Sequence, residues 1–254
     1  MNDPFLPLLI QVTLAVMQSF LRVAGIAVCI AGGVGLGCKS SDGGAAGEKG
    51  ASAGQAADPS GSYAISSSTN PGGAPGYTGS TTITRSGDIH DVTWTIPNTP
   101  PYTGVAVLSG STLGVGWGMG SRYGVAVYKV SGGQLSGRWA TKGSGARAGT
   151  EVLDGPAGLN GAYKITSGSA PDGKSYTGTV SITPTGETYA VKWTLPSDSY
   201  SGVGIKQGDT LVVGWGEAGK GAGVVSYEVS ASTLNGKWAT PGGTQLGTEI
   251  LGKR

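Results

Sequence analysis

Four charged residues occupy matched positions in two similar halves of the chain and are candidates for ion pairs or acid–base chemistry in the interior. Glu151 and Glu249 each follow Gly-Thr near the end of a half, and Arg138 and Lys237 each stand one residue before a Trp. A buried carboxylate needs a partner, and these basic residues are the candidates. The pattern therefore predicts two structural ion pairs, Glu151 with Arg138 and Glu249 with Lys237, and favours structure over catalysis there.

Other residues suited to catalysis are sparse. His90 is the one histidine of the chain and its counterpart is Tyr189, so the halves cannot share a histidine triad or a multi-histidine metal site. Asp88 and Glu187 occupy matched turns, where turn hydrogen bonding explains them and no second carboxylate completes an acid–base pair. The sequence therefore predicts no catalytic residue, no metal site and no cofactor.

Aromatic residues offer a different chemistry, the binding of a flat or apolar ligand. The six Trp fall three to each half, and in Leu113–Gly118 large residues alternate with glycines, which places them on opposite faces of a strand. The aromatic residues expected to point inward are Trp94, Trp117, Trp139, Trp193, Trp215, Trp238, Tyr63 and Tyr163. They either pack a core or contact a ligand, and the sequence leaves both roles open.

These residues are positioned by an internal duplication of about 100 residues. The segments VTWTIP, LGVGWG and LSGRWAT of the first half match VKWTLP, LVVGWG and LNGKWAT of the second. Each half contains short runs of period two bounded by Gly, Asp, Asn and Pro, which predicts strands and no helix. In the first half the expected strands are 61–67, 77–85, 89–96, 103–109, 112–118, 123–130, 134–141 and 149–153.

Eight short strands joined by tight turns predict a closed antiparallel up-and-down β-barrel in each half, because closure removes exposed sheet edges. A β-sandwich is the alternative. The expected organisation is a first barrel over 60–153, a linker over 154–160 and a second barrel over 161–254. Glycines opposite the large residues indicate strand bends or the close approach of another backbone.

The composition excludes several classes of protein. Glycine makes up 49 of 254 residues, which is too many for a helical protein, and the absence of a strict triplet excludes collagen. The chain has 17 Lys and Arg against 15 Asp and Glu, a formal charge of +2, and its basic residues are scattered. Nucleic acid is therefore not an expected partner.

The front of the chain reads as an export signal. A start at Met17 gives a short basic region, then an apolar stretch from Val23 to Gly37, followed by Cys38. This layout resembles a bacterial lipoprotein signal, which implies a signal peptide over 1–37 and a diacylated Cys38 that anchors the protein to a membrane. A Gly-, Ser- and Ala-rich tether then completes 38–59. A plain membrane anchor or an ordinary secretion signal is the alternative, and Lys39 favours the outer membrane by the same resemblance.

A second resemblance covers both halves. The pattern G-x-Y-x-I, P-D-G-x-x-Y-x-G-x-V-x-I, V-x-W, L-x-V-G-W-G and L-x-G-x-W is clearest at Gly161–Ile165 and Pro171–Ile182. It is similar to that of a group of small exported bacterial proteins, largely uncharacterised, some of which carry a fibronectin-binding label. The strand count and inward Trp also resemble lipocalin-like and avidin-like barrels, the calycin-like architecture.

Together these features predict a lipid-anchored or secreted protein of the bacterial cell envelope. Its two barrels are expected to display non-catalytic binding or adhesion modules for an extracellular or envelope macromolecule. The alternative is a carrier that holds small apolar ligands inside Trp-lined barrels. An envelope glycan hydrolase is the weakest alternative, since it needs a cleft with paired carboxylates.

Overall fold

The computed structural model describes residues 57–118, 122–217 and 222–254. The predicted signal peptide, the start at Met17, the lipidated Cys38 and most of the tether lie outside these residues. Residues Ala51–Arg254 form one compact unit. All strand pairs and all three apolar clusters of the described residues lie within this unit.

The described chain is almost entirely β-structure. Its strands are β1 (Gly61–Thr69), β2 (Gly79–Ser86), β3 (Ile89–Thr95), β4 (Tyr102–Ser109), β5 (Thr112–Trp117), β6 (Tyr123–Ser131), β7 (Gln134–Thr141), β8 (Gly149–Asp154), β9 (Gly161–Ser169), β10 (Gly178–Pro184), β11 (Tyr189–Thr194), β12 (Ser199–Gln207), β13 (Thr210–Glu217), β14 (Gly223–Val229), β15 (Thr233–Ala239) and β16 (Gly247–Lys253). A single 3-10 turn, η1 (Pro71–Gly73), follows β1.

The eight strands predicted for the first half are confirmed, with ends that agree within about two residues. Tight turns separate them because glycine supplies the positive φ that hairpins need. Gly87 has φ 58° between β2 and β3, and Gly110 has φ 57° between β4 and β5. Period-two patterning and turn glycines therefore carry the local structure.

The strands close into two eight-stranded antiparallel barrels, which confirms the predicted fold class over the sandwich. Barrel I has the order β1-β16-β15-β14-β5-β4-β3-β2, and barrel II has the order β10-β11-β12-β13-β6-β7-β8-β9. Each barrel has its own interior apolar cluster.

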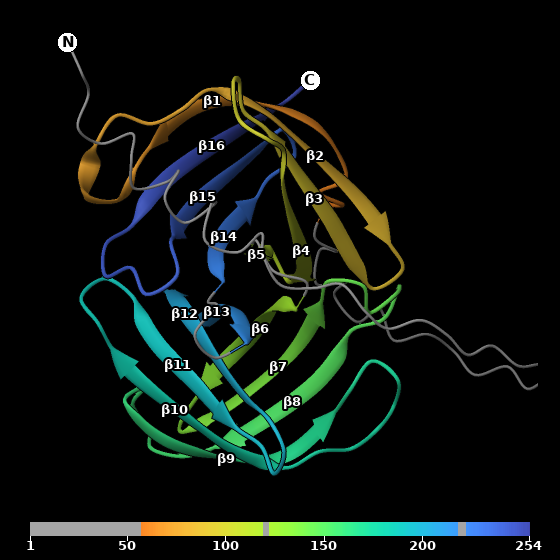
Figure 1. Cartoon of the computed structure of the whole chain (residues 1–254), viewed down its shortest axis with the longest axis vertical. Coiled ribbons are helices and arrows are strands. Elements are labelled where there is room, and N and C mark those ends of the chain that lie inside the picture. The colour runs from red at the N-terminus through yellow and green to blue at the C-terminus, as the bar shows by residue number, and fades with distance from the viewer. Residues whose placement is uncertain (1–56, 119–121, 218–221) are drawn as a thin grey trace, which may run out of the picture. The chain divides into compact units, whose positions relative to one another are not determined.

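The predicted assignment of one barrel to each half is wrong, because the halves exchange strands. Barrel I joins 61–117 to 223–253, whereas barrel II is the continuous segment 123–217. In Figure 1 the orange and yellow strands accordingly lie with the blue ones, and the green and cyan strands form the other barrel. The exchange is possible because β5 and β13 carry nearly the same sequence, so β6 pairs with β13 as it would with β5.

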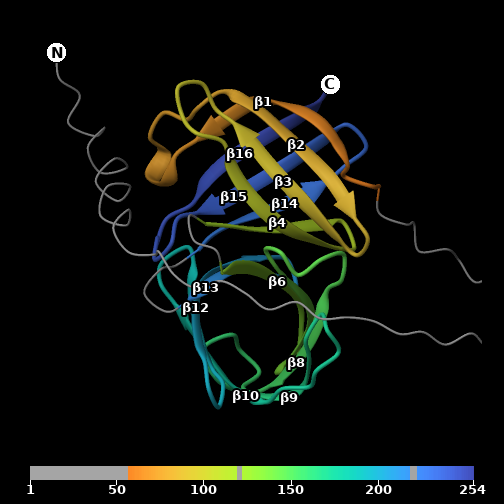
Figure 2. The ribbon, with the colours of Figure 1, turned by 45° about the vertical axis from the view of Figure 1, so that its right-hand side comes forward.

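A third apolar cluster lies between the barrels and includes Val105 and Val107 of barrel I with Val125 and Val127 of barrel II. The glycine faces of β5 and β13 belong to this contact. A Cβ at Gly116 would lie 1.9 Å from the Gly124 carbonyl oxygen. The predicted close approach of another backbone is thus confirmed, and that backbone belongs to the other barrel. Figure 2 shows β4 of barrel I beside β6 of barrel II.

Candidate functional site

Each barrel contains one deeply buried glutamate that is surrounded by hydroxyl and indole donors. In barrel II, Glu151 is 2% exposed. The Tyr128 hydroxyl donates to its Oε2 over 2.5 Å, the Trp193 indole donates to Oε2 over 3.2 Å, and the Tyr176 hydroxyl donates to Oε1 over 2.9 Å. An ionised carboxylate is an acceptor only, and these three donors satisfy both of its oxygens. We call Glu151 and its three donors the carboxylate cluster of barrel II.

The strand register builds this cluster around a glycine. Gly137 on β7 pairs with Tyr128 on β6 and with Glu151 on β8. A Cβ at Gly137 would lie 2.6 Å from the Tyr128 ring. The missing side chain therefore lets the tyrosine ring lie across β7, so that its hydroxyl reaches the carboxylate on the next strand.

Barrel I repeats the arrangement with residues exchanged between the halves. Glu249 is 1% exposed and accepts from Tyr77 over 2.8 Å, from Trp94 over 3.1 Å, and from Tyr227. Gly236 stands between Tyr227 and Glu249 in the ladder, as Gly137 does in barrel II. In both barrels the glutamate and one tyrosine come from one half of the chain, and the other two donors come from the other half.

The predicted ion pairs are wrong. Glu151 faces Gly137 across the ladder, so the next residue, Arg138, points to the opposite side of the sheet, where its guanidinium lies 3.5 Å from the Asp88 carboxylate. Lys237 likewise pairs with Thr248 rather than with Glu249. A shift of one residue changes the face of a strand, which the repeat pattern alone did not reveal.

Burial dominates the titration of the cluster. Desolvation, with a contribution from the Glu151 charge, raises the pKa of Tyr128 and of Tyr176 well above the usual range, so both hydroxyls keep their protons and remain donors. Desolvation also raises the pKa of Glu151 above its ordinary value, while its three hydrogen bonds oppose that rise. The same burial raises the pKa of Tyr77 and Tyr227 in barrel I.

Four aromatic rings, one of them Tyr176 of the carboxylate cluster, line the mouth of barrel II. We call Trp139, Tyr176, Tyr200 and Trp215 the aromatic cage. Their ring centroids lie 6.1 Å apart for Trp139 and Tyr176, 5.9 Å for Trp139 and Trp215, and 5.2 Å for Tyr200 and Trp215. The interplanar angles are 72° to 77°, so neighbouring rings form adjacent walls rather than a stack.

A cavity of about 220 Å³ lies within these walls. Its lining consists of Ala126, Tyr128, Trp139, Glu151, Ala170, Tyr176, Trp193, Leu195, Tyr200 and Trp215. Several of these residues stand at the ends of β7, β11 and β13 or at the start of β12, which places the cavity at one end of the barrel. The cage residues are only partly buried, so this end is accessible.

Glycines on neighbouring strands also leave space for the indole rings. Gly124 pairs with Trp215 and Gly149 pairs with Trp139, and a Cβ on either glycine would lie about 2.5 to 2.6 Å from the indole. Each indole therefore lies flat over a neighbouring strand. Nε1 of Trp139 is buried without a hydrogen-bond partner among the described residues, as is Nε1 of Trp238 in barrel I.

The structure sorts the predicted aromatic residues into two groups. Trp139, Trp193 and Trp215 meet in barrel II, and Trp94, Trp117 and Trp238 lie in barrel I. Tyr63 and Tyr163 belong to the same apolar clusters, but their hydroxyls donate to the Pro59 and Gly158 carbonyls. Tyr163 is not among the residues that line the cavity of barrel II.

Sequence reasoning missed the tyrosines of the site. The residues concerned are Tyr77, Tyr102, Tyr128, Tyr176, Tyr200 and Tyr227. They form three pairs at matched positions in the two halves, and each lies in a strand or just before one. A search for tyrosines repeated between the halves would have placed them beside the repeated Trp.

His90 lies in β3 and is 4% exposed, so it is a buried strand residue rather than a surface residue. Its Nε2 is 3.5 Å from the Asp58 carboxylate. Desolvation lowers the pKa of His90, and the nearby Asp58 opposes this. The described residues contain no group of three or more His, Cys, Asp or Glu side chains that could hold a metal.

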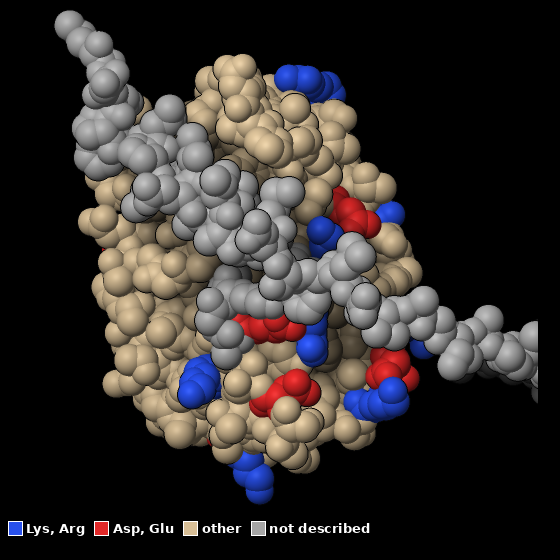
Figure 3. All heavy atoms as spheres, viewed as in Figure 1, with Lys and Arg blue, Asp and Glu red and all other residues tan. Residues whose placement is uncertain are grey.

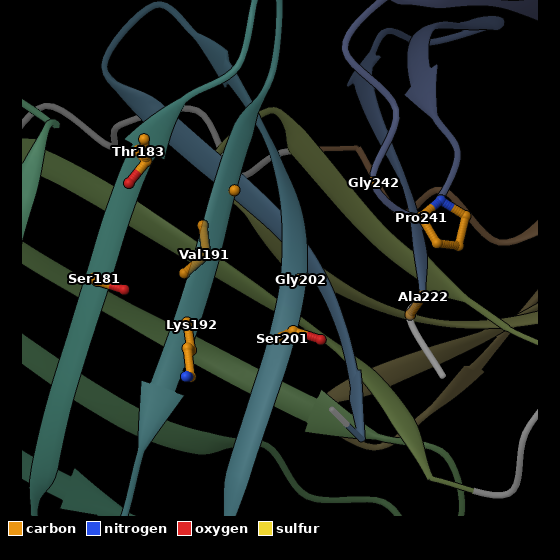
Figure 4. A pocket seen from close by; sticks show the side chains of 10 residues that line it. Ser181, Thr183, Val191, Lys192, Ser201, Gly202, Ala222, Pro241 and Gly242 are labelled. Atoms are coloured by element: carbon orange, nitrogen blue, oxygen red, sulfur yellow. The ribbon is translucent and has the colours of Figure 1, made fainter. Parts of the chain in front are cut away.

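A second groove, of about 290 Å³, lies between the outer face of barrel II and residues of barrel I. Figure 4 shows Ser181, Thr183, Lys192 and Ser201 on three adjacent strands, with Pro241 of barrel I opposite them. Small side chains and one lysine line this groove. It brings together no aromatic rings and no buried polar groups, so the cage is the stronger candidate site.

The described surface is mixed in charge. On the face in Figure 3, outside the grey atoms, Lys and Arg lie interspersed with Asp and Glu and form no large patch of one sign. The search for membrane-spanning helices, made over the described ranges, finds none of sufficient length and hydropathy.

The fold and the site define a protein of two strand-exchanged barrels, one with an aromatic cavity at its mouth. No protein-family model, no curated protein and no solved structure matches the chain. The resemblance to small exported barrel proteins therefore stays a prediction from the sequence.

Proposed function

We propose that the protein is a non-catalytic binding protein of the cell envelope that holds a small ligand at the mouth of barrel II. The observation that carries this proposal is the cavity of about 220 Å³, walled by the aromatic cage and floored by the buried Glu151. Concave sites lined by aromatic side chains with a few placed polar groups are typical of small-molecule binding.

The volume limits the ligand. Pockets for drug-sized molecules span about 300–1,000 Å³. A cavity of about 220 Å³ is smaller than that range, so it takes a small molecule or one end of a larger one. This supports the carrier prediction in a narrower form, with a single group held at the mouth rather than a long chain threaded through the barrel.

The lining supports binding rather than turnover. Glu151 is the one carboxylate among the residues that line the cavity, and both of its oxygens already accept hydrogen bonds. Glycoside hydrolysis uses two carboxyl groups that flank the scissile bond. We therefore place the protein among binding proteins and not among envelope hydrolases.

Adhesion to a macromolecule stays a prediction from the sequence. Ile250, at 38% exposure, is the one exposed large hydrophobic side chain of the described residues. Interfaces with stable protein partners usually have an apolar core. The aromatic cavity is therefore the better supported binding surface.

Trp fluorescence tests the proposal directly, because the fluorescent side chains that line the cavity include Trp139, Trp193, Trp215 and Tyr200. A bound ligand should change the emission of these residues. The unit of residues 51–254 is titrated with a panel of small apolar, aromatic, sugar and amine ligands. A saturable spectral shift with at least one ligand is expected. Ala126→Phe, which places a ring in the cavity, should abolish it. Failure of every ligand to bind, or binding that survives Ala126→Phe, would refute the site.

The envelope location rests on the leader and is tested separately. Cys38→Ala should release the full chain from membranes, because acyl burial is worth ~0.8 kcal/mol per CH₂. Removal of residues 1–16 should leave export intact if Met17 is the true start. Membrane retention of the Cys38→Ala variant in cell fractionation would refute the lipid anchor.

A further inference from the structure

The buried charge of Glu151 is left without a cationic partner. Its donors are two tyrosine hydroxyls and one indole, all neutral. Among the described residues no Lys, Arg or His forms an ion pair with it. Buried charges are ordinarily paired, so in its ionised form this carboxylate, stabilised by neutral dipoles alone, places a net negative potential in the cavity.

The walls of the cavity add to that potential. The face of an aromatic ring carries partial negative charge and attracts cations within about 6 Å of its centroid. Four rings meet at 72° to 77° around the mouth of barrel II, so the cavity has several ring walls at different orientations. Aromatic walls above an ionised floor are the arrangement that recognises an alkylated ammonium group.

We propose that the cage of barrel II binds a small organic cation, a quaternary or methylated ammonium group. This inference rests on the proposed function and names its ligand class. The cation enters between the cage rings and lies above Glu151, where its positive charge compensates the carboxylate without displacing the three donors. Its apolar methyl groups contact the indole walls.

Other ligand classes fit the same lining less well. An anion would be repelled by Glu151, and the Tyr128, Tyr176 and Trp193 donors are already directed at that carboxylate. A sugar needs several polar partners, whereas apart from this satisfied cluster the polar groups of the lining side chains are the Tyr200 hydroxyl and the Trp139 and Trp215 indole N–H groups. A neutral apolar ligand would fit the walls but would leave the buried charge uncompensated.

One cation already stands at the rim. The Arg122 guanidinium donates to the Tyr200 hydroxyl over 3.2 Å, and it lies 3.3 Å from the Glu217 carboxylate. The Arg122 side chain is 57% exposed, so solvent and Glu217 screen its charge from the cavity. It orients Tyr200 as one wall and does not fill the cage.

The test compares two ligands of the same shape. Choline and its neutral isostere 3,3-dimethylbutan-1-ol are titrated against residues 51–254 by Trp fluorescence and calorimetry. We expect one choline per chain and an affinity about tenfold or more above that of the isostere, in line with cation–π interactions at desolvated sites. This comparison needs no variant, so it does not depend on how a substitution folds.

Two variants locate the charge that produces the preference. Glu151→Gln should reduce the preference for choline over the isostere to the part that the ring walls supply, whereas Glu228→Gln, which removes an exposed carboxylate of barrel I, should leave the preference unchanged. Equal affinity for the two ligands, or absence of choline binding while another panel ligand binds, would overturn the cation proposal and leave the proposed function standing. Absence of binding by choline and by the whole panel would overturn both.

Discussion

The two barrels share a carboxylate cluster and matched aromatic rings, but they differ at single positions around them. Glu151 and Glu249 each accept from two tyrosines and one tryptophan, and each stands beside a ladder glycine. At the wall of the cavity, however, barrel II has Ala126 where barrel I has Val225. Deeper inside, barrel II has Val180 where barrel I has Thr81.

This difference bears on which features serve structure and which serve binding. The carboxylate cluster is present in both barrels and is most simply explained by folding, since both barrels must close around it. The matched aromatic rings are also present in both barrels. The smaller side chain at position 126 leaves more space at the cavity wall of barrel II than Val225 leaves at the matched position of barrel I.

The largest effect is expected where the cluster is shared. Gly137→Val and Gly236→Val each place a side chain where a tyrosine ring lies, with the Cβ 2.6 Å from that ring. Overpacking and the loss of a hydrogen bond to a buried carboxylate should together lower the free energy of unfolding by about 3–5 kcal/mol. Urea unfolding measures both variants.

The comparison predicts a cost in both barrels and the larger cost at Gly137, because a Cβ there would also lie 2.4 Å from the Val127 carbonyl oxygen, whereas a Cβ at Gly236 meets no backbone atom closer than 3.1 Å. Gly252→Ala is the control, since a Cβ there meets nothing within 4 Å. A cost confined to one barrel would show that the cluster has a structural role in that barrel alone.

The next effect concerns Ala126, the residue proposed to set the volume of the cavity in barrel II. Ala126→Val should weaken ligand binding in barrel II by tenfold or more, because added methyl groups occupy the cavity wall. Val225→Ala should cost about 2 kcal/mol of stability and open a second site, so that two ligands bind per chain. Calorimetry gives both stoichiometries. Unchanged binding in both variants would mean that another difference, such as Leu195 against Ile96, separates the barrels.

A smaller effect is expected at the interior hydroxyl of barrel I. Thr81 is fully buried, and its Oγ1 has no hydrogen-bond partner among the described residues. Thr81→Val should therefore raise the free energy of unfolding by about 1 kcal/mol, whereas the reciprocal Val180→Thr should lower it by about 1–3 kcal/mol. Destabilisation by Thr81→Val would show that the hydroxyl does find a partner.

Much of this fold could be predicted from the sequence, because its signals are local. Strand ends are marked by turn glycines such as Gly87. Strand faces are marked by the alternation of large residues, as at Leu113, Val115 and Trp117. The inward direction of all six Trp follows from the same alternation.

The exchange of strands could not be predicted, because it leaves every local signal unchanged. β6 pairs through Val125 and Val127 with β13 in the structure, and β5 offers nearly the same edge. Barrels with and without strand exchange contain equivalent strand pairs. The two arrangements therefore differ only in the path that the chain takes between strands. The ion-pair prediction failed for a related reason, since Arg138 and Gly137 differ by one residue and therefore by one face.

The smallest predicted effect is a dependence of stability on pH that belongs to Glu151. Burial raises the folded pKa of this carboxyl above its unfolded value, so the folded state binds the proton more tightly. The stabilisation from that proton is complete below the unfolded pKa, and it is lost as pH rises through the folded pKa. Each unit of pKa difference corresponds to about 1.4 kcal/mol.

Because other carboxyl groups also titrate in this range, the informative quantity is the difference between the natural protein and Glu151→Gln. Urea unfolding from pH 4 to pH 8 should show the natural protein losing stability relative to Glu151→Gln as pH rises. Saturating choline should reduce that relative loss, since a bound cation favours the ionised carboxylate. A difference that stays constant with pH, or that changes in the opposite direction, would mean that the three donors outweigh burial and that the cavity of barrel II carries no unfavourable charge for a cation to compensate.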